Sequence, residues 1–414
     1  MTTLVRWLSL LLLTVPLAVS YGSSCAPPRD IYQPVYLSYH DLRDAVTVTD
    51  ARPINDANRI LTRGDTLYVV ERDVGLHVID NGDPSAPEKL AFIEVPGARN
   101  AVAKDDHIYI DSYVDLVVID VADVAAIEEV GRVEDALPYW RAEYFETAWT
   151  DPPDPSQGVV VDQVFVEQQV FTCSGDSFGG SACSRGGGGS ASATPDTGGE
   201  TSVGSLSAFF VVDDVLYLLA DEELRVYSLA TPTAPTLVWA SLVANVPETL
   251  FALDNTLLVG GQLGVEIFDI SSPTEPHYTG TFQHAWQCDP VVAQGDLAFV
   301  TLRSGQGCGG TRDELDIIDI SDIANPVLLA SYQLDSPNGL AIDGNLLLVT
   351  DSLRGLLVFD VSTPEQPFVS AAESGLDSLD VIAADGLAIV MRVDSIVQYA
   401  YTELGALTEI SVLD

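Results

Sequence analysis

Basic residues are scarce in this sequence. Its 414 residues include 18 Lys and Arg against 61 Asp and Glu, which gives a formal net charge of −43 at pH 7. A surface of this sign repels phosphate backbones and anionic lipid headgroups, so the composition excludes nucleic-acid binding and electrostatic attachment to a membrane. The acidic excess indicates either a soluble surface or one that accumulates cations.

Metal-binding and phosphate-binding motifs are also missing. There is no His-Glu-x-x-His zinc motif, no phosphate-binding loop and no EF-hand loop. The five histidines, which are His40, His77, His107, His277 and His284, do not have the spacing of metal ligands. We therefore predict no catalytic residue, and no motif demands a cofactor.

A long apolar run occurs at the N-terminus. Arg6 is followed by "WLSLLLLTVPLAV" (7–19), which is too short for a membrane span and indicates an export signal over residues 1–24. Two cleavage sites are consistent with this signal. The segment "AVS" (18–20) suits an ordinary signal peptidase, whereas "GSSC" resembles a lipobox that ends at Cys25, with Gly22 where an aliphatic residue is usual.

The number of cysteines favours lipidation. Cys25 stands apart from four others, which form the close groups Cys173 with Cys183 and Cys288 with Cys308. In an exported protein both groups are expected to form disulfides, which leaves Cys25 for a lipid anchor. Residues 25–43 are then a flexible tether to an outer membrane or cell surface. Ordinary cleavage predicts a secreted soluble protein instead.

The dominant pattern is a repeat of about 40 residues. Seven units share an apolar strand, and they read "LHVID" (76–80), "LVVID" (116–120), "LRVYS" (224–228), "VEIFD" (265–269), "LDIID" (315–319), "LLVFD" (356–360) and "IVQYA" (396–400). The period predicts an all-β fold, a β-propeller of seven four-stranded blades over residues 44–414. Either residues 46–53 or residues 406–413 complete the last blade. The Asp that ends most of these strands is expected to form an Asx turn.

These repeats resemble the LVIVD-repeat family, because the segment "LVVID" (116–120) nearly matches the motif that names the family. The resemblance covers roughly residues 50–400 and implies a secreted or surface β-propeller without an assigned activity. The Gly-His and Trp-Asp signatures of WD repeats are not found.

One loop-rich insertion, at 138–204, interrupts the period before the first strand of the third blade. The first strand of each blade begins at one face, called the top, and the loops between second and third strands return to it. The insertion therefore rises from the top, and its Gly- and Ser-rich end (184–199) predicts disorder. The same rule brings Cys288 and Cys308 together in the fifth blade, which supports their disulfide.

Aromatic side chains gather on these top-face segments. The candidates for partner binding are Tyr139, Trp140, Tyr144, Trp149 and Trp286. They form either a small core that fixes the insertion to the propeller or a platform for a protein or glycan.

A second set of polar residues precedes the first strands and is expected at the top mouth of the central channel. The candidate metal ligands are Glu248, Asp289, Asn338, Asn100 and Asp380. Their oxygens suit Ca²⁺, and propeller lactonases hold a metal at the same place. Arg59 and Arg99 stand in the same ring and oppose a cation.

Two functions follow from these patterns. The first is an exported, surface-anchored, non-enzymatic binding or scaffold protein that holds a protein or glycan on its top-face loops. The alternative is a Ca²⁺-dependent, lactonase-like hydrolase with its site at the channel mouth.

Overall fold

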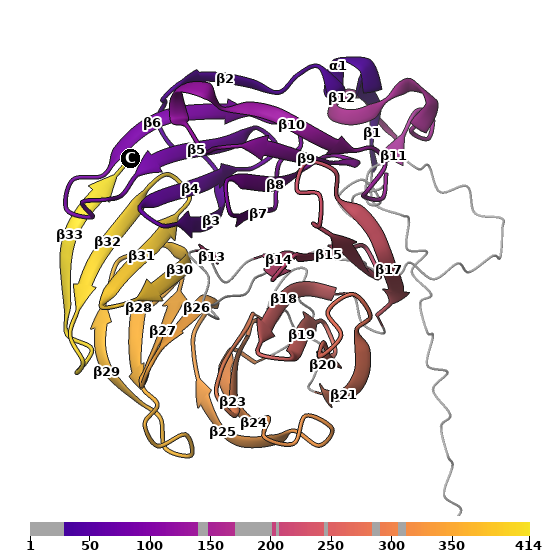
Figure 1. Ribbon diagram of the computed structural model, residues 1–414. Coiled ribbons are helices and arrows are strands. Elements are labelled where there is room, and N and C mark those ends of the chain that lie inside the picture. The colour runs from indigo at the N-terminus through magenta and orange to yellow at the C-terminus, as the bar shows by residue number, and fades with distance from the viewer. Residues whose placement is uncertain are drawn as a thin grey trace, which may run out of the picture.

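The computed structural model describes residues 29–139, 148–169, 201–203, 207–243, 247–283, 290–304 and 312–414. Seven antiparallel sheets stand around a central axis, which confirms the seven-bladed propeller (Figure 1). Helix is confined, within those ranges, to α1 (Tyr39–Arg43) and two short 3-10 turns, Val124–Ala126 and Pro155–Gln157. None of the described helices could cross a bilayer.

Each blade is a meander whose strands run in chain order from the central axis outward. Blades 1 and 2 contain β3 (Ala57–Arg63), β4 (Thr66–Glu71), β5 (Gly75–Asp80), β6 (Glu88–Glu94), β7 (Ala101–Lys104), β8 (His107–Ser112), β9 (Asp115–Asp120) and β10 (Glu128–Val133). Blades 3 and 4 contain β14 (Phe209–Val212), β15 (Val215–Ala220), β16 (Glu223–Ser228), β17 (Thr236–Leu242), β18 (Pro247–Leu253), β19 (Thr256–Gly261), β20 (Gly264–Asp269) and β21 (His277–Gln283).

The remaining three blades repeat the same order. They contain β22 (Val291–Gln294), β23 (Leu297–Leu302), β24 (Glu314–Asp319), β25 (Val327–Gln333), β26 (Pro337–Asp343), β27 (Leu346–Asp351), β28 (Gly355–Asp360), β29 (Phe368–Glu373), β30 (Ser378–Ala384), β31 (Leu387–Arg392), β32 (Ile396–Tyr401) and β33 (Leu407–Leu413). All seven repeated pentapeptides are therefore third strands of blades.

The turns of the repeat have two local causes. The first residue between strands one and two has a positive φ of 50–58° in every blade, and it is Gly64, Asp105, Asp213, Asp254, Gly295, Gly344 or Asp385. Gly and Asp tolerate this left-handed conformation. After the third strand, the expected Asx turn is confirmed: the Asp80, Asp120, Asp269, Asp319 and Asp360 carboxylates accept from the amide two residues on at 2.8–2.9 Å.

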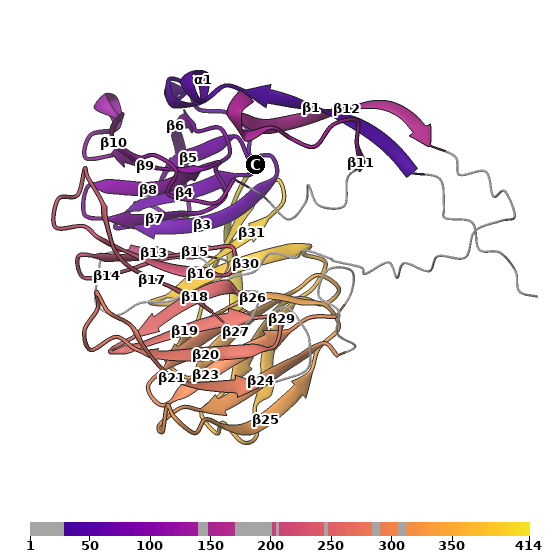
Figure 2. The ribbon, with the colours of Figure 1, turned by 90° about the vertical axis from the view of Figure 1, so that its right-hand side faces the viewer.

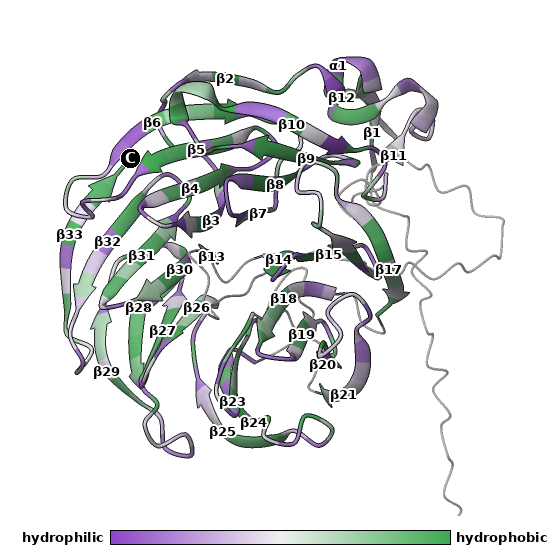
Figure 3. Ribbon diagram, in the orientation of Figure 1, coloured by the Kyte–Doolittle hydropathy of each residue, from purple (hydrophilic) through white to green (hydrophobic). Residues whose placement is uncertain are grey.

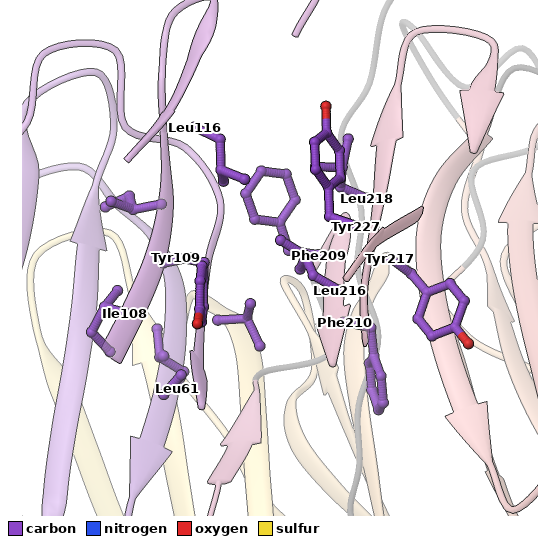
Figure 4. Close-up of a cluster of buried hydrophobic side chains, with 14 of the residues drawn as sticks. Leu61, Ile108, Tyr109, Leu116, Phe209, Phe210, Leu216, Tyr217, Leu218 and Tyr227 are labelled. Atoms are coloured by element: carbon purple, nitrogen blue, oxygen red, sulfur yellow. The ribbon is translucent and has the colours of Figure 1, made fainter. Parts of the chain in front are cut away.

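The core lies between the blades, because each inner strand is covered on both faces by its neighbours. Apolar strands with polar turns are visible in Figure 3, and Figure 4 shows the packing of blade 2 against blade 3. Tyr109 crosses this interface and donates its hydroxyl to the Pro232 carbonyl at 3.1 Å. Tyr217 repeats the contact one blade later, to Pro273 at 2.7 Å. Burial raises the pKa of both phenols, which keeps them neutral donors.

The ring closes with the C-terminal strand. β33 is the fourth strand of blade 7, so 406–413 completes that blade, whereas β2 (Thr47–Asp50) adds an outer strand to blade 1. Blades 1 and 7 thus share no sheet, although the Ala57 amide of blade 1 donates to the Val393 carbonyl of blade 7 at 2.8 Å. Buried Gln398 and Asn81 exchange two amide hydrogen bonds of 3.0 and 2.7 Å across this junction.

Residues 29–43, for which the sequence predicts a flexible tether, form β1 (Arg29–Leu37) and α1 instead. β1 pairs with β11 (Ala148–Trp149) and β12 (Val159–Gln169) of the insertion, and this sheet projects from the ring (Figure 2). We call α1 and the sheet β11–β1–β12 the accessory module. The apolar side chains of Leu37 and Leu42 explain why this segment is folded, because both pack against residues of the insertion and of blade 2.

The end of the insertion reaches the central axis. β13 (Thr201–Val203) pairs antiparallel with the inner edge of β3, so blade 1 has six strands. Since β3 is otherwise the innermost strand of its blade, β13 takes space inside the channel (Figure 1).

Candidate binding site on the top face

Four of the five candidate metal ligands are described, and they do lie at the expected end of the inner strands. Asn100 directly precedes β7, Glu248 and Asn338 lie at the starts of β18 and β26, and Asp380 lies at the start of β30. Asp289 lies outside the described residues. The placement confirms that the sequence rule orients the blades, and the contacts decide what these side chains do.

The amides of this ring join neighbouring parts of the propeller. Asn100 donates its backbone and side-chain nitrogens to Asp111 at 2.9 and 3.0 Å. Asn338 donates to the Ser352 hydroxyl at 2.7 Å and to the Ser378 carbonyl of the next blade at 3.0 Å. The side-chain oxygens, which a cation would need, are also used: Asn338 Oδ1 accepts from Arg303, and Asn100 Oδ1 accepts from the Ala208 amide at 3.4 Å.

The carboxylates are paired with positive or polar groups. Glu248 accepts from Gln262 at 3.1 Å. The fully buried Asp380 interacts electrostatically with Arg59. Burial lowers the pKa of Arg59 to about 10, against the opposing effect of Asp380. Arg99 forms a two-point ion pair with Asp73, with distances of 2.8 and 2.7 Å.

The described part of the mouth therefore carries its own cations. Arg59 opposes the charge of Asp380, and Arg99 opposes the charge of Asp73. Over the described ranges no three His, Cys, Asp or Glu residues are grouped as a metal site. The strand β13 also lies along the inner edge of β3, at its Leu61–Arg63 end.

A charged network fastens the accessory module to blade 2. Asp115, whose side chain is fully buried, accepts from Arg43 of α1 at 2.9 and 3.2 Å and from Arg132 of β10 at 3.1 Å. The Asp135 amide donates to the same carboxylate at 2.9 Å. Burial by itself would raise the pKa of Asp115, but the hydrogen bonds from Arg43, Asp135 and Arg132 outweigh it and lower the pKa.

An apolar cluster lies beside this network. Leu42, Val114 and Val159 are buried together, with Tyr39, Tyr113 and Tyr139 packed around them. Tyr139 also donates its hydroxyl to the Gly158 carbonyl at 2.9 Å. Of the two roles open to Tyr139, the structure favours the core that fixes the insertion over a partner-binding surface.

Trp149 has a different environment. It lies opposite Tyr32 in the β11–β1 pair, and Tyr32 lies opposite Phe165 in the β1–β12 pair. Directly opposite residues share a face of a sheet, so the three aromatics form a row across the module. Tyr32 and Phe165 meet edge to face at 5.8 Å, and Phe165 is 53% exposed.

Tyr32 and Phe165 were not among the candidates predicted from the sequence. The apolar run "VVVDQVFV" (159–166) signalled a strand, but its partner β1 is over a hundred residues away along the chain. Only that pairing shows that the aromatic row exists.

Other sequence candidates lie outside the described residues. They are Trp140, Tyr144, Trp286, Asp289 and all five cysteines, Cys25, Cys173, Cys183, Cys288 and Cys308. The sequence predicts no nucleophile elbow, although the Gly-x-Ser-x-Gly spacing of that motif does occur at Gly175–Gly179, outside the described residues. The anchor, the disulfides and these aromatics stay predictions.

Blade order and repeat geometry define the class of protein as a seven-bladed β-propeller, here with an accessory module on its top face. Four segments, residues 55–91, 97–135, 309–334 and 337–371, match the LVIVD repeat. The chain thus contains LVIVD repeats in these four segments, and the resemblance read from "LVVID" is confirmed. No curated protein matches the sequence.

Solved structures share the fold at low identity. Sqt1 of Saccharomyces cerevisiae is 7% identical over 92% of this chain and 88% of its own, with a TM-score of 0.51. BamB of Moraxella catarrhalis is 11% identical over 85% and 84%, with a TM-score of 0.46. Hsv2 of Kluyveromyces lactis is 10% identical over 88% and 99%, with a TM-score of 0.47. The likeness to Sqt1 is one of fold alone.

Proposed function

We propose that this protein is an exported binding or scaffold propeller, anchored to the cell surface through Cys25, that holds a protein or glycan partner on its accessory module. The observation that carries the proposal is the aromatic row of Trp149, Tyr32 and Phe165, in which Phe165 is 53% exposed and the other two are partly buried. Rigid aromatic side chains supply large contact areas at low entropic cost, and they are enriched at binding hot spots.

The arrangement of charges supports a binding role over hydrolysis. At the described channel mouth, Arg59 opposes the charge of Asp380 and Arg99 is paired with Asp73, whereas the aromatic row projects from the ring on a separate sheet (Figure 2). A propeller that holds its module through the Asp115 network presents this row on a rigid base.

The test uses a triple variant, Tyr32→Ala/Trp149→Ala/Phe165→Ala, of the soluble chain that begins at Ala26. Its matched control is Phe368→Ala, because Phe368 is 55% exposed on β29, far from the module, and Phe165 is 53% exposed. Both proteins and the wild type are applied to a glycan array and cross-linked to cell-envelope extract. We expect ligands that the wild type and Phe368→Ala retain and the triple variant loses. Equal ligand sets for all three proteins would refute the proposal.

The anchor has its own experiment. In cells that carry out lipoprotein processing, the wild-type chain is expected to incorporate a clickable palmitate analogue and to sediment with membranes. Cys25→Ser should abolish the label and release the protein. A Cys25→Ser variant that still carries the label would rule out this anchor.

A further inference from the structure

The accessory sheet has one long outer edge. Among the described residues, β12 pairs with β1 only, in the order β11–β1–β12. Four apolar side chains of its segment 161–167 are 37–55% exposed, namely Val161, Val164, Phe165 and Val166. Proteins usually protect such edges with lysine, proline or a covering element, and an unprotected apolar edge accepts an additional strand.

The hydrogen bonds of β1 identify which β12 backbone groups point outward. The Tyr32 carbonyl accepts from Thr150 of the β11 segment at 2.8 Å, so Tyr32 directs its backbone toward β11. The next residue, Gln33, therefore directs its backbone toward β12, where its partner is Val164. Because alternate residues face opposite sides, the N–H and C=O groups of Gln163 and Phe165 point away from β1. The Gln163 N–H donates to the neighbouring Asp162 carboxylate at 2.7 Å, a local bond that an added strand would replace.

Charge identifies the kind of strand that fits. Residues 148–169 contain the carboxylates of Asp151, Asp154, Asp162 and Glu167 and no Lys or Arg, and Asp162 and Glu167 are exposed on β12 itself. A second copy of the chain would bring the same carboxylates and another net charge of −43. A neutral glycan would use the aromatic row without needing the outward N–H and C=O groups.

We propose that residues 161–167 of β12 receive an extended, cationic segment of a partner protein as an added strand of the accessory sheet. Backbone hydrogen bonds to Phe165 and Gln163 supply the pairing, with the added strand taking the Gln163 N–H from Asp162. The released Asp162 carboxylate and Glu167 select basic side chains. This inference rests on the proposed binding function and specifies its partner as a polypeptide.

The test titrates a synthetic peptide, Lys-Val-Thr-Val-Lys-Val-Lys, into the soluble chain that begins at Ala26. Gln163→Pro removes an outward N–H while the Gln33–Val164 pairing stays, and Gln163→Ala removes the same side chain while the N–H stays. We expect the proline variant to bind about tenfold or more weakly, since it loses a hydrogen bond and its ring obstructs the added strand. The alanine variant should stay within about twofold of the wild type. A peptide with Glu in place of Lys should bind about tenfold more weakly.

Amide exchange on the wild-type protein provides a second test that does not depend on the folding of any variant. Peptide should slow exchange at Gln163 and Phe165 and leave Val164, which already faces β1, unchanged. No peptide binding, or equal affinities for the proline and alanine variants, overturns the added strand. A glycan that the aromatic triple variant loses and Gln163→Pro retains would sustain the proposed function and refute this inference.

Discussion

Replacing Asp115 tests whether the charged network, rather than apolar contact alone, holds the accessory module on blade 2. Asp115→Ala leaves Arg43 and Arg132 without their shared carboxylate, and the Arg132 side chain is only 9% exposed. Removing one partner of a buried ion pair costs about 3–5 kcal/mol. We take about 3 kcal/mol, because Arg43 is 25% exposed and keeps its ion pair with Glu134 at 2.6 Å.

Hydrogen exchange locates this loss. If the lost free energy stabilises the module against local opening, the amides of α1 should exchange about a hundredfold faster in Asp115→Ala, while β5 amides stay protected. One such amide is that of Leu42, which is bonded to the Ser38 carbonyl at 2.9 Å. The control, Glu129→Gln, removes the second carboxylate that is paired with Arg132. The Glu129 side chain is 24% exposed, so this change should cost about 1 kcal/mol or less. Equal α1 exchange rates in Asp115→Ala and Glu129→Gln would refute the reasoning.

The pH dependence of the same variant follows from the sign of the shift. The folded-state pKa of Asp115 lies below the ordinary 3.8, so the network contributes its stability above that value and loses it as the pH falls through the lower folded value. The difference between wild type and Asp115→Ala should therefore be constant from pH 7 to 5 and shrink in stronger acid.

Three further predictions concern the ring itself. Gln398→Ala should lower the free energy of unfolding by about 2 kcal/mol in urea titrations, because it leaves Asn81 unpaired at the junction of blades 1 and 7; a loss below about 0.5 kcal/mol would contradict closure through this pair. His77, buried against Glu71 at 2.9 Å, has its pKa lowered by burial, so its protonation favours unfolding and stability should fall as the pH drops below the ordinary 6.5. His77→Gln should flatten the melting temperature between pH 7 and 5, and an unchanged slope would exclude His77 as the cause. Millimolar Ca²⁺ should leave the melting temperature unchanged. A site whose Kd lies a hundredfold below the added Ca²⁺ concentration would instead stabilise the protein by about 2.7 kcal/mol. Such a stabilisation, if Glu248→Gln abolished it, would establish the calcium site.

The repeat was predictable in detail because its causes are local. Apolar runs such as "LVVID", the Gly or Asp at positive φ after each first strand, and the Asx turns each depend on a few adjacent residues. Seven copies of the same local signal identify a propeller even where one copy, such as "LRVYS", is weak. The top face could be assigned for the same reason, since chain direction alternates regularly within a blade.

The candidate site was less predictable because its residues come from distant parts of the chain. Trp149 was a candidate, but its neighbours Tyr32 and Phe165 depend on pairing between the N-terminal segment and the insertion. The sequence placed Asn100, Glu248, Asn338 and Asp380 at the starts of first strands. It could not show their partners, since Asn100, Glu248 and Asn338 are bound by residues beyond their own strands.

By itself, the sequence determined the number of blades, the direction of their strands, the turn conformations and the acidic surface, since each depends on residue type and spacing along the chain. Only the tertiary structure decided that β33 completes the last blade, that β13 enters the channel and that residues 29–43 join the insertion. These outcomes depend on which unpaired backbone and apolar surfaces meet once the ring exists. Hydrogen bonding and burial then select among segments that appear equally suitable as strands in the sequence.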